Sequence, residues 1–390
     1  MVTLTSAENA LKSVYLNVLS EQLNINSNAF LSKINKTSKD VYGKEIIKLA
    51  PFGLNGGIGA GTETGELPKA SNHSFLQFKT ALKNLYGTIA ISDKAIRASQ
   101  SNTGAFVNLL DDEMESLIKS SAFNLGRMLY GDGTGKVAKV ASVTTTDKVP
   151  VLDSVRNLVE GMKIDIYNGS TLVKGNLTIT YVDRANKKII CNESLSEVAS
   201  AGNLIYACGS KDNEITGIGR IFDTTDDNKV LYGVDRSSYK WLYPYIENYS
   251  TETSISDSVI QKAINEIEEL TGSQPDFIAM SNDVRSSYQS YLTSFRRNID
   301  ITTLEGGYKA MTYAGIPIVF ERFVEKGSMY LLNTKDFNLH QLCDWEWITG
   351  ENGNILIPSA TTPTYTATLV KYAELICDRP AGQGKVTNLK

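Results

Sequence analysis

The sequence predicts an α+β protein in which an extended arm and one long helix precede a small β-unit and a mixed α/β region. Three observations favour this class. A glycine-rich segment at 53–66 has few apolar side chains to bury. Apolar residues recur at helical spacing over 104–130. Short alternating strands separated by turn residues occupy 158–209, and beyond residue 215 helical and strand patterns mix.

The composition is that of a globular protein of two or three domains. Of the 390 residues, 42% are hydrophobic, so a substantial core is expected. The net charge is −4 and no block of Lys and Arg occurs, which argues against direct nucleic-acid binding through a basic surface. Neither an N-terminal apolar leader nor a long apolar run is present, so we expect neither secretion nor a membrane span.

The N-terminal region predicts a helix over 7–23, which Ser6 can cap, followed by a polar, exposed arm over 24–40. The glycine-rich segment comes next and leads into a β-prone stretch at 74–91. Its glycines raise the entropic cost of ordering it. A long segment that cannot bury itself is either disordered or ordered by a neighbouring molecule. Because this one leads directly into a rigid helix, we expect a neighbouring molecule to order it.

The strongest helical pattern runs from Gly104 to Tyr130. Acidic residues lie in its first half, where the helix dipole favours anions. Asn102 or Thr103 can cap its start, and Gly131 can end it. At about 1.5 Å per residue the helix would span roughly 40 Å. One row on its surface consists of Phe106, Leu110, Met114, Leu117, Ser121, Leu125 and Met128.

The β-unit at 158–209 contains Asn168-Gly169, a typical hairpin turn. Beyond it, helices are predicted at 256–270 and 283–297. Strands are predicted at 276–280, 315–320, 328–333 and 364–377.

This order of elements resembles the major capsid proteins of tailed bacteriophages, the Hong Kong 97-type fold. Residues 51–68 resemble the first strand and tip of that family's extended hairpin, the E-loop, through Gly57-Ile-Gly-Ala-Gly-Thr-Glu63 and Gly65-Glu-Leu-Pro68. Residues 75–91 resemble the returning strand, and 108–135 resemble the long "spine" helix and its exit. The match lies in the order and spacing of the pieces.

The resemblance implies a division into six segments. These are an N-terminal arm at 1–50, an E-loop at 51–91, the spine helix with a peripheral (P) domain at 92–156, an inserted small β-barrel at 157–210, an axial (A) domain with part of the P domain at 211–360, and a C-terminal P-domain strand at 361–390.

The implied function is structural, not enzymatic. Subunits would assemble through hexamers and pentamers into an icosahedral head around the phage genome, without sequence-specific DNA binding. A separate scaffolding protein and a portal are implied partners, and a decoration protein is a further candidate. Assembly would occur in the bacterial host cytoplasm, and the protein would end in the virion capsid. Glu63, Glu66 and Lys69 at the loop tip are candidate residues for ion pairs between subunits.

Three other functions are alternatives for this sequence. An encapsulin, a bacterial shell that holds enzymes, would share the fold. A surface adhesin built on the β-unit is disfavoured because no leader is present. A nucleotide-dependent enzyme would use Gly131-Asp-Gly-Thr-Gly-Lys136, but this stretch is one residue shorter than a P-loop, Val137 replaces its Ser or Thr, and it follows a helix.

The sequence contains no clear motif for a metal site, a catalytic site or a disulfide. His73 and His340 have no metal-ligand spacing, and we expect no catalytic, cofactor-binding or metal-binding residues. The four cysteines form no C-x-x-C pair and are expected to be buried and reduced. The segment 344–347, Asp-Trp-Glu-Trp, has the composition of a carbohydrate-binding patch but fits a packed strand better.

Overall fold

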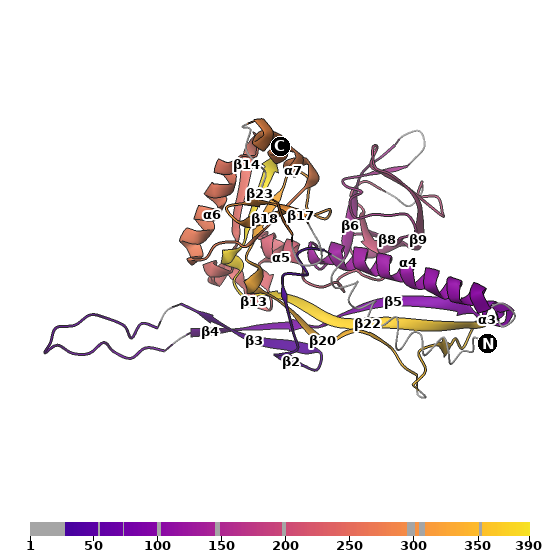
Figure 1. Cartoon of the computed structure of the whole chain (residues 1–390), viewed down its shortest axis with the longest axis horizontal. Helices are drawn as coiled ribbons and strands as arrows, with labels where there is room; N and C mark the ends of the chain where they lie inside the picture. The colour runs from indigo at the N-terminus through magenta and orange to yellow at the C-terminus, as the bar shows by residue number, and fades with distance from the viewer. Residues whose placement is uncertain are drawn as a thin grey trace.

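The computed structural model describes residues 28–390, apart from 54, 73, 100–102, 145–148, 197–199, 295–300, 304–308 and 351–352. A seven-stranded upper sheet and a closed barrel lie side by side above a base sheet, and a long helix runs between the barrel and the base sheet (Figure 1). A hairpin extends away from this body at one end (Figure 1). The helix predicted over 7–23 lies outside the described residues.

The hairpin consists of two long antiparallel strands. Strand β3 (Glu45–Phe52) pairs with β4 (Ser74–Ala81) over its whole length, and the short β2 (Val41–Tyr42) pairs with β3. Ile46 and Phe78 are fully buried in a small cluster with Leu242. The root of the hairpin is therefore packed on the body, in the region of β12 (Val230–Leu231) and β13 (Val234–Asp235).

The base sheet lies under the long helix. Its strands are β1 (Asn35–Thr37), β20 (Phe337–Trp347), β22 (Thr364–Cys377), β21 (Ile357–Pro358) and β5 (Lys83–Ser92). The predicted strand at 364–377 is confirmed. Trp345 and Trp347 are both buried in the main core, so the strand interpretation of this segment is confirmed and no aromatic patch is exposed there.

The long helix α4 (Thr103–Leu129) confirms the predicted helix at 104–130. It follows the short helix α3 (Asp93–Ser99). Leu117, Leu125 and Met128 are buried against the base sheet. Gly87 of β5 faces Leu117, and a Cβ there would lie 2.8 Å from Leu117 Cδ1. Glycine thus lets the helix approach the strand closely.

The barrel closes in the order β10-β7-β6-β11-β8-β9 around an apolar core. The turn between β8 and β9 contains Gly169 with φ +60°, as the Asn-Gly pair predicts. The barrel begins earlier than the predicted segment 157–210, because β6 and β7 belong to it. The alternation in β6 is interrupted, since Val137 and Ala138 are both buried. Its strands are β6 (Lys136–Val143), β7 (Pro150–Leu152), β8 (Lys163–Asn168), β9 (Thr171–Asp183), β10 (Lys188–Cys191) and β11 (Leu204–Ala207).

The upper sheet has the order β14-β23-β19-β15-β18-β17-β16. Two helices, α6 (Asp257–Thr271) and α7 (Asn282–Ser294), confirm the helices predicted there as far as residue 294, and α5 (Ile218–Phe222) precedes them. The strands are β14 (Tyr245–Thr253), β15 (Phe277–Met280), β16 (Ile301–Thr303), β17 (Lys309–Tyr313), β18 (Ile316–Phe320), β19 (Met329–Leu332) and β23 (Gly384–Leu389).

The chain ends in the upper sheet and not beside β22, unlike the predicted C-terminal P-domain strand at 361–390. After β22, the turn Pro380–Gly382 redirects the chain, and β23 inserts between β14 and β19. Gly384 lets α6 pack closely on β23, because a Cβ there would lie 2.6 Å from Ile267 Cδ1.

All four cysteines are free, as expected, but they are not all buried. Cys191 and Cys377 are buried, Cys343 is partly buried and Cys208 is exposed. Among the described residues, no helix has the length and apolar character that crossing a membrane requires.

Candidate intersubunit site

The connection between β3 and β4, residues 53–72, is called the arm. Every residue from 58 to 72 is exposed, including Ile58 at 77% and Leu67 at 89%. The arm projects past the body as a long open loop (Figure 1). Two hydrogen bonds hold it locally, from Gly65 N–H to the Thr62 carbonyl and from Gly57 N–H to Asn55 Oδ1. Its apolar side chains have no partner surface on the subunit's described part.

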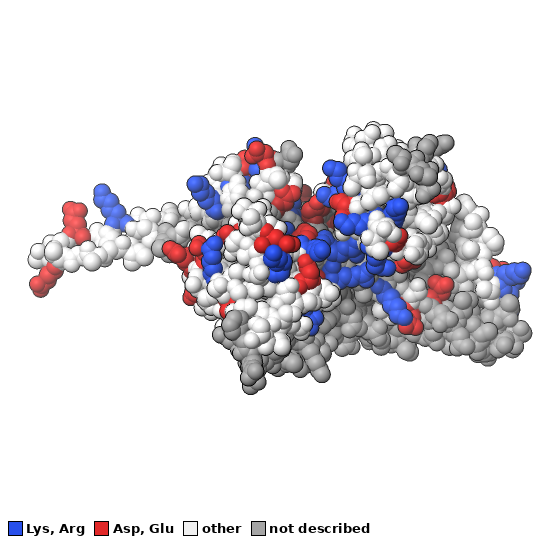
Figure 2. Space-filling view, turned by 90° about the horizontal axis from the view of Figure 1, so that it is seen from above, with Lys and Arg blue, Asp and Glu red and all other residues white. Residues whose placement is uncertain are grey.

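Glu63, Glu66 and Lys69 all lie on this arm and are exposed. Figure 2 shows acidic groups towards its free end and a basic group closer to the body. Within the described part of the chain, none of the three forms an ion pair. The structure thus places all three candidate residues together on one projecting element, and no partner of theirs is present.

The root of the arm, in contrast, is firmly packed. The Phe52 ring stacks on Trp241 at 6.0 Å and meets Tyr239 edge-on at 5.7 Å. Phe78 packs against Trp241 and Tyr232. Such aromatic pairs contribute roughly 0.5–1.5 kcal/mol each beyond their burial. The arm is therefore an unsupported loop on a rigid base.

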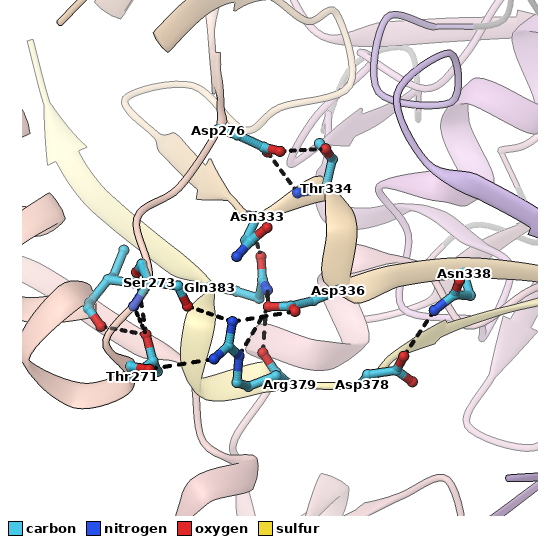
Figure 3. Close-up of polar contacts among 11 residues, drawn as sticks. Thr271, Ser273, Asp276, Asn333, Thr334, Asp336, Asn338, Asp378, Arg379 and Gln383 are labelled. Carbon is cyan, nitrogen blue, oxygen red and sulfur yellow. Dashed lines mark hydrogen bonds and ion pairs between the residues drawn. The ribbon is translucent and has the colours of Figure 1, made fainter. Parts of the chain in front are cut away.

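Two chain crossings connect the upper sheet to the base sheet, and a polar network ties them together (Figure 3). The first crossing leaves β19 and enters β20, and the second leaves β22 and enters β23. Arg379 on the second pairs with Asp336 on the first, with Nε 3.3 Å from Oδ2. Gln383 also donates to Asp336 and accepts a hydrogen bond of 2.8 Å from the Asn333 N–H. The two crossings are thereby held side by side.

Arg379 also joins the crossings to the end of α6. Its guanidinium donates to Ser273 Oγ and, at 3.4 Å, to the Thr271 carbonyl oxygen. A cation near a helix C-terminus interacts favourably with the helix dipole. Burial raises the pKa of Asp336, and Arg379 opposes that shift. One side chain thus connects three separate segments.

Two further carboxylates complete this interdomain junction. Asp276, just before β15, accepts hydrogen bonds from the Thr334 N–H and hydroxyl at 2.7 and 2.8 Å. Asp378 accepts from Asn338 at 2.9 Å and pairs with Lys48 of β3 at 2.7 Å. Because Lys48 belongs to the root of the arm, the junction links the arm to both sheets. No local sequence motif marks these residues, because their partners lie far apart in the chain.

A second buried network lies where α4 ends. Arg127 and Glu214 form a bidentate ion pair, and each side chain is 2% exposed. Glu374 of β22 accepts a hydrogen bond of 2.6 Å from the Thr216 N–H, and burial raises its pKa to about 7. Gly217 packs so closely that a Cβ would lie 2.3 Å from the Met128 carbonyl oxygen. This network fixes the end of the long helix against the base sheet.

The segment 131–136 does not have the geometry of a phosphate-binding loop. It follows α4 and runs directly into strand β6, whereas a P-loop must open a helix. Gly135, with φ +81°, is packed so tightly that a Cβ would lie 2.4 Å from the Ser210 carbonyl oxygen. The residues that the structure describes also contain no group of three or more His, Cys, Asp or Glu that could hold a metal ion.

Comparison with known proteins decides the fold. No protein-family model matches the sequence, and no curated protein matches it. Among solved structures, the capsid asymmetric unit of Cyanophage A-1(L) superimposes with a TM-score of 0.52 at 12% identity, over 92% of this chain and 90% of that chain. The chain has the Hong Kong 97-type fold.

Two further structures align less well. The capsid of an empty GTA particle gives a TM-score of 0.47 at 9% identity, over 92% of this chain and 89% of that one. The SrpI encapsulin from Synechococcus elongatus PCC 7942 gives 0.46 at 9% identity, over 92% and 85%. The Hong Kong 97-type fold predicted from the order of the elements is confirmed by the cyanophage structure.

Proposed function

We propose that this chain is a major capsid protein of a tailed bacteriophage, which assembles into an icosahedral shell around the genome. The observation that carries the proposal is the combination of a Hong Kong 97-type fold with an arm that finds no partner among the described residues of its own subunit. In this proposal the arm with β3 and β4 acts as the E-loop, and α4 acts as the spine helix. The upper sheet acts as the A domain.

The assembly mechanism follows from the exposed apolar residues. Ile58 and Leu67 would be buried when the arm lies over a neighbouring subunit. Complete burial of one such side chain stabilises by about 1.5–3 kcal/mol. A closed shell repeats this contact at every subunit, so many individually weak contacts add up to a stable particle. The upper sheets would gather around the fivefold and sixfold axes.

Glu63, Glu66 and Lys69 would contribute ion pairs with the neighbouring subunit. Exposed pairs of this kind contribute about 0.2–1 kcal/mol and weaken as salt rises. We therefore assign them a role in orienting the arm, while apolar burial supplies most of the stabilisation. The rigid root and the Arg379 junction would hold the arm at a fixed angle to both sheets.

The proposed partners are further copies of this chain, a separate scaffolding protein, a portal and a decoration protein. The shell would enclose DNA without reading its sequence, which agrees with a net charge of −4 and no basic block in the chain. Assembly would take place in the host cytoplasm. A non-enzymatic role fits the packed geometry of the segment 131–136.

Negative-stain electron microscopy tests this proposal. The chain would be expressed alone and together with its neighbouring gene products. Uniform icosahedral shells or tubes are the expected result, and nucleic acid inside them would favour the phage capsid. Enzyme cargo inside the shells would instead indicate an encapsulin. A monodisperse monomer or dimer under every condition would contradict both readings.

A further inference from the structure

Strand β5 has one unpaired edge. In the base sheet β5 pairs with β22 alone, in an antiparallel register that runs from Thr364↔Ser92 to Ala373↔Lys83. No other described strand pairs with it. A ten-residue edge without a partner is unusual, because proteins normally shorten, charge or cover such edges.

Three hydrogen bonds fix which residues of β5 face this open edge. Asp93 N–H donates to the Pro363 carbonyl, so residues 93 and 363 form a hydrogen-bonded pair. The odd-numbered residues of β5 therefore exchange hydrogen bonds with the odd-numbered residues of β22. The even-numbered residues of β22 bond on its other side, because the carbonyls of Thr364 and Thr368 accept hydrogen bonds from the N–H groups of Ser359 and Ile348. Because hydrogen-bonded and non-bonded pairs alternate in antiparallel sheets, the even-numbered residues of β5 point outwards.

Asn84, Tyr86, Thr88 and Ala90 therefore direct their N–H and C=O groups away from β22. These eight groups extend over roughly 20 Å. They have no hydrogen-bond partner among the described residues. None of the four residues is charged or is proline, so the usual protections of an edge strand are absent.

A groove of about 1400 Å³ runs beside this edge. Its walls are residues 81–88, the part of α4 from 116 to 128, and the base of the barrel. Its lining contains Lys163, Lys83, which donates to the Asp212 carbonyl, and Lys119, which is paired with Glu115. Of its two carboxylates, Glu214 is already paired with Arg127. The groove therefore suits an extended segment that carries a carboxylate, which Lys163 and Lys83 could face.

We propose that the outer edge of β5 receives the returning half of a neighbouring subunit's arm, residues 66–72, as an added β-strand. This inference rests on the proposed function and names the surface that the arm occupies. The arm supplies what the edge lacks, namely a backbone at 66–72 that has no hydrogen-bond partner within the described part of the subunit. Main-chain pairing of this kind gives affinity, while pockets for alternate side chains give specificity.

The composition of the arm favours its returning half, 66–72, as the strand that pairs with β5. The outgoing half, 55–61, contains four glycines in seven residues and is a poor strand. The returning half contains none. Its Pro68 has no N–H, which fixes the orientation: Leu67, Lys69 and Ser71 must direct their N–H groups at β5, and Pro68 must face away.

Residue-level hydrogen–deuterium exchange on the full chain, unassembled and in shells, tests the pairing. In the free subunit, the amides of Asn84, Tyr86, Thr88 and Ala90 should exchange quickly while those of the odd-numbered residues are slow. In shells, the four even-numbered amides should slow by at least about tenfold. Fast exchange there in intact shells would overturn this inference and leave the proposed function standing. Protection already present in the free subunit would also overturn it.

Disulfide trapping identifies the occupant. In a Cys208→Ser, Cys343→Ser background, Lys69→Cys would be combined in turn with Asn84→Cys, Tyr86→Cys, Thr88→Cys and Ala90→Cys. Directly opposed strand residues have Cβ atoms about 4.5–5.5 Å apart, close enough for a disulfide to form with small movements. At least one combination should give covalent multimers in oxidised shells. Asn55→Cys, on the other half of the arm, is the matched control and should give none.

Failure of all four Lys69→Cys combinations in well-formed shells would rule out this strand as the occupant. Thr88→Pro tests the pairing independently, because it removes one outward N–H of β5 and leaves the hydrogen bonds between β5 and β22 intact. It should keep the circular dichroism and melting temperature of the parent but reduce shell yield at least about tenfold, whereas Thr88→Val should not. Equal yields from both variants would count against the pairing. Absence of shells from the parent chain would instead contradict the proposed function.

Discussion

At the scale of single residues, Arg379 contributes more than its partly exposed position suggests. Its contacts reach the crossing that contains Asp336, the end of α6 at Thr271, and the loop at Ser273. Removing it would leave the largely buried carboxylate of Asp336 without its cation. Arg379 is 39% exposed, so solvent screens part of that cost.

Arg379→Met should lower the free energy of unfolding by about 1–3 kcal/mol, below the cost of breaking a fully buried pair. Urea denaturation of the unassembled subunit would measure it. Arg97→Met is the control, because Arg97 forms a surface pair with Asp93 one helical turn away. Equal effects of the two substitutions would show that the junction does not stabilise the subunit.

The buried carboxylate of Glu321 makes stability depend on pH. Burial raises its pKa to about 8 from an ordinary 4.5. A group whose pKa is raised by folding contributes stability that is full below its unfolded pKa and lost as pH rises through its folded pKa. The subunit should therefore lose stability between about pH 4.5 and pH 8 through this residue.

Glu321→Gln removes that dependence. The melting temperature of the variant relative to the parent should rise from pH 5 to pH 8.5, as measured by scanning calorimetry. The exposed Glu113→Gln on α4 should follow the parent throughout. A pH-independent difference between Glu321→Gln and the parent would show that Glu321 is not buried in its neutral form.

At the scale of elements, close backbone approach decides where α4 ends. Gly217 has φ −79°, which any residue adopts, so its requirement for glycine is purely steric. Three carbonyl oxygens, of Met128, Leu129 and Gly131, lie 2.3–2.7 Å from a Cβ built there. Backbone atoms of a buried helix end cannot move aside as a side-chain tip can.

Gly217→Ala should therefore lower the free energy of unfolding by about 1–3 kcal/mol, in the range of overpacked cores. The control is Gly350→Ala, whose Cβ would make only ordinary contacts at 3.6 Å and beyond. We expect the control to stay within about 0.5 kcal/mol of the parent. Chemical denaturation measures both, and a neutral Gly217→Ala would mean that the spine end is loosely packed.

Elements with strong local signals were predictable. The helix α4 has a long apolar row, and β22 is a fourteen-residue β-prone run, so both were located from sequence. The strands β6 and β7 were not assigned to the barrel, because β6 lacks clean alternation and β7 has only three residues. Their membership is decided by barrel closure, a property of six strands together.

At the scale of the whole molecule, folding and assembly depend on different residues. The body buries its core without help from the arm, while the arm's apolar side chains remain exposed at Ile58 and Leu67. A change on the arm should therefore affect particles and spare the subunit.

Leu67→Asp should leave the melting temperature of the subunit within about 2 °C of the parent, since surface substitutions rarely change stability. It should nevertheless abolish or strongly reduce shell formation, because an aspartate cannot be buried without a partner. Leu172→Asp, an exposed leucine on the barrel, is the control. Electron microscopy and sedimentation would measure particle yield, and normal shells from Leu67→Asp would remove Leu67 from the interface.

The candidate site could be predicted only in part. Glu63, Glu66 and Lys69 were named from the sequence because the resemblance placed them at a loop tip, and their contact role stays a prediction. The Arg379 junction could not be named, since Asp336, Ser273 and Gln383 come together only when two crossings lie side by side.

The sequence by itself determined the long helix, the strand β22 and an arm that cannot bury itself, because each depends on local periodicity or composition. Tertiary structure alone decided that β23 joins the upper sheet, that β6 and β7 complete the barrel, and that β5 pairs with β22 alone among the described strands. Strand partners are chosen by contacts between residues far apart in the chain. A local pattern shows that a segment is a strand and which faces it has, but it does not encode which strand lies beside it.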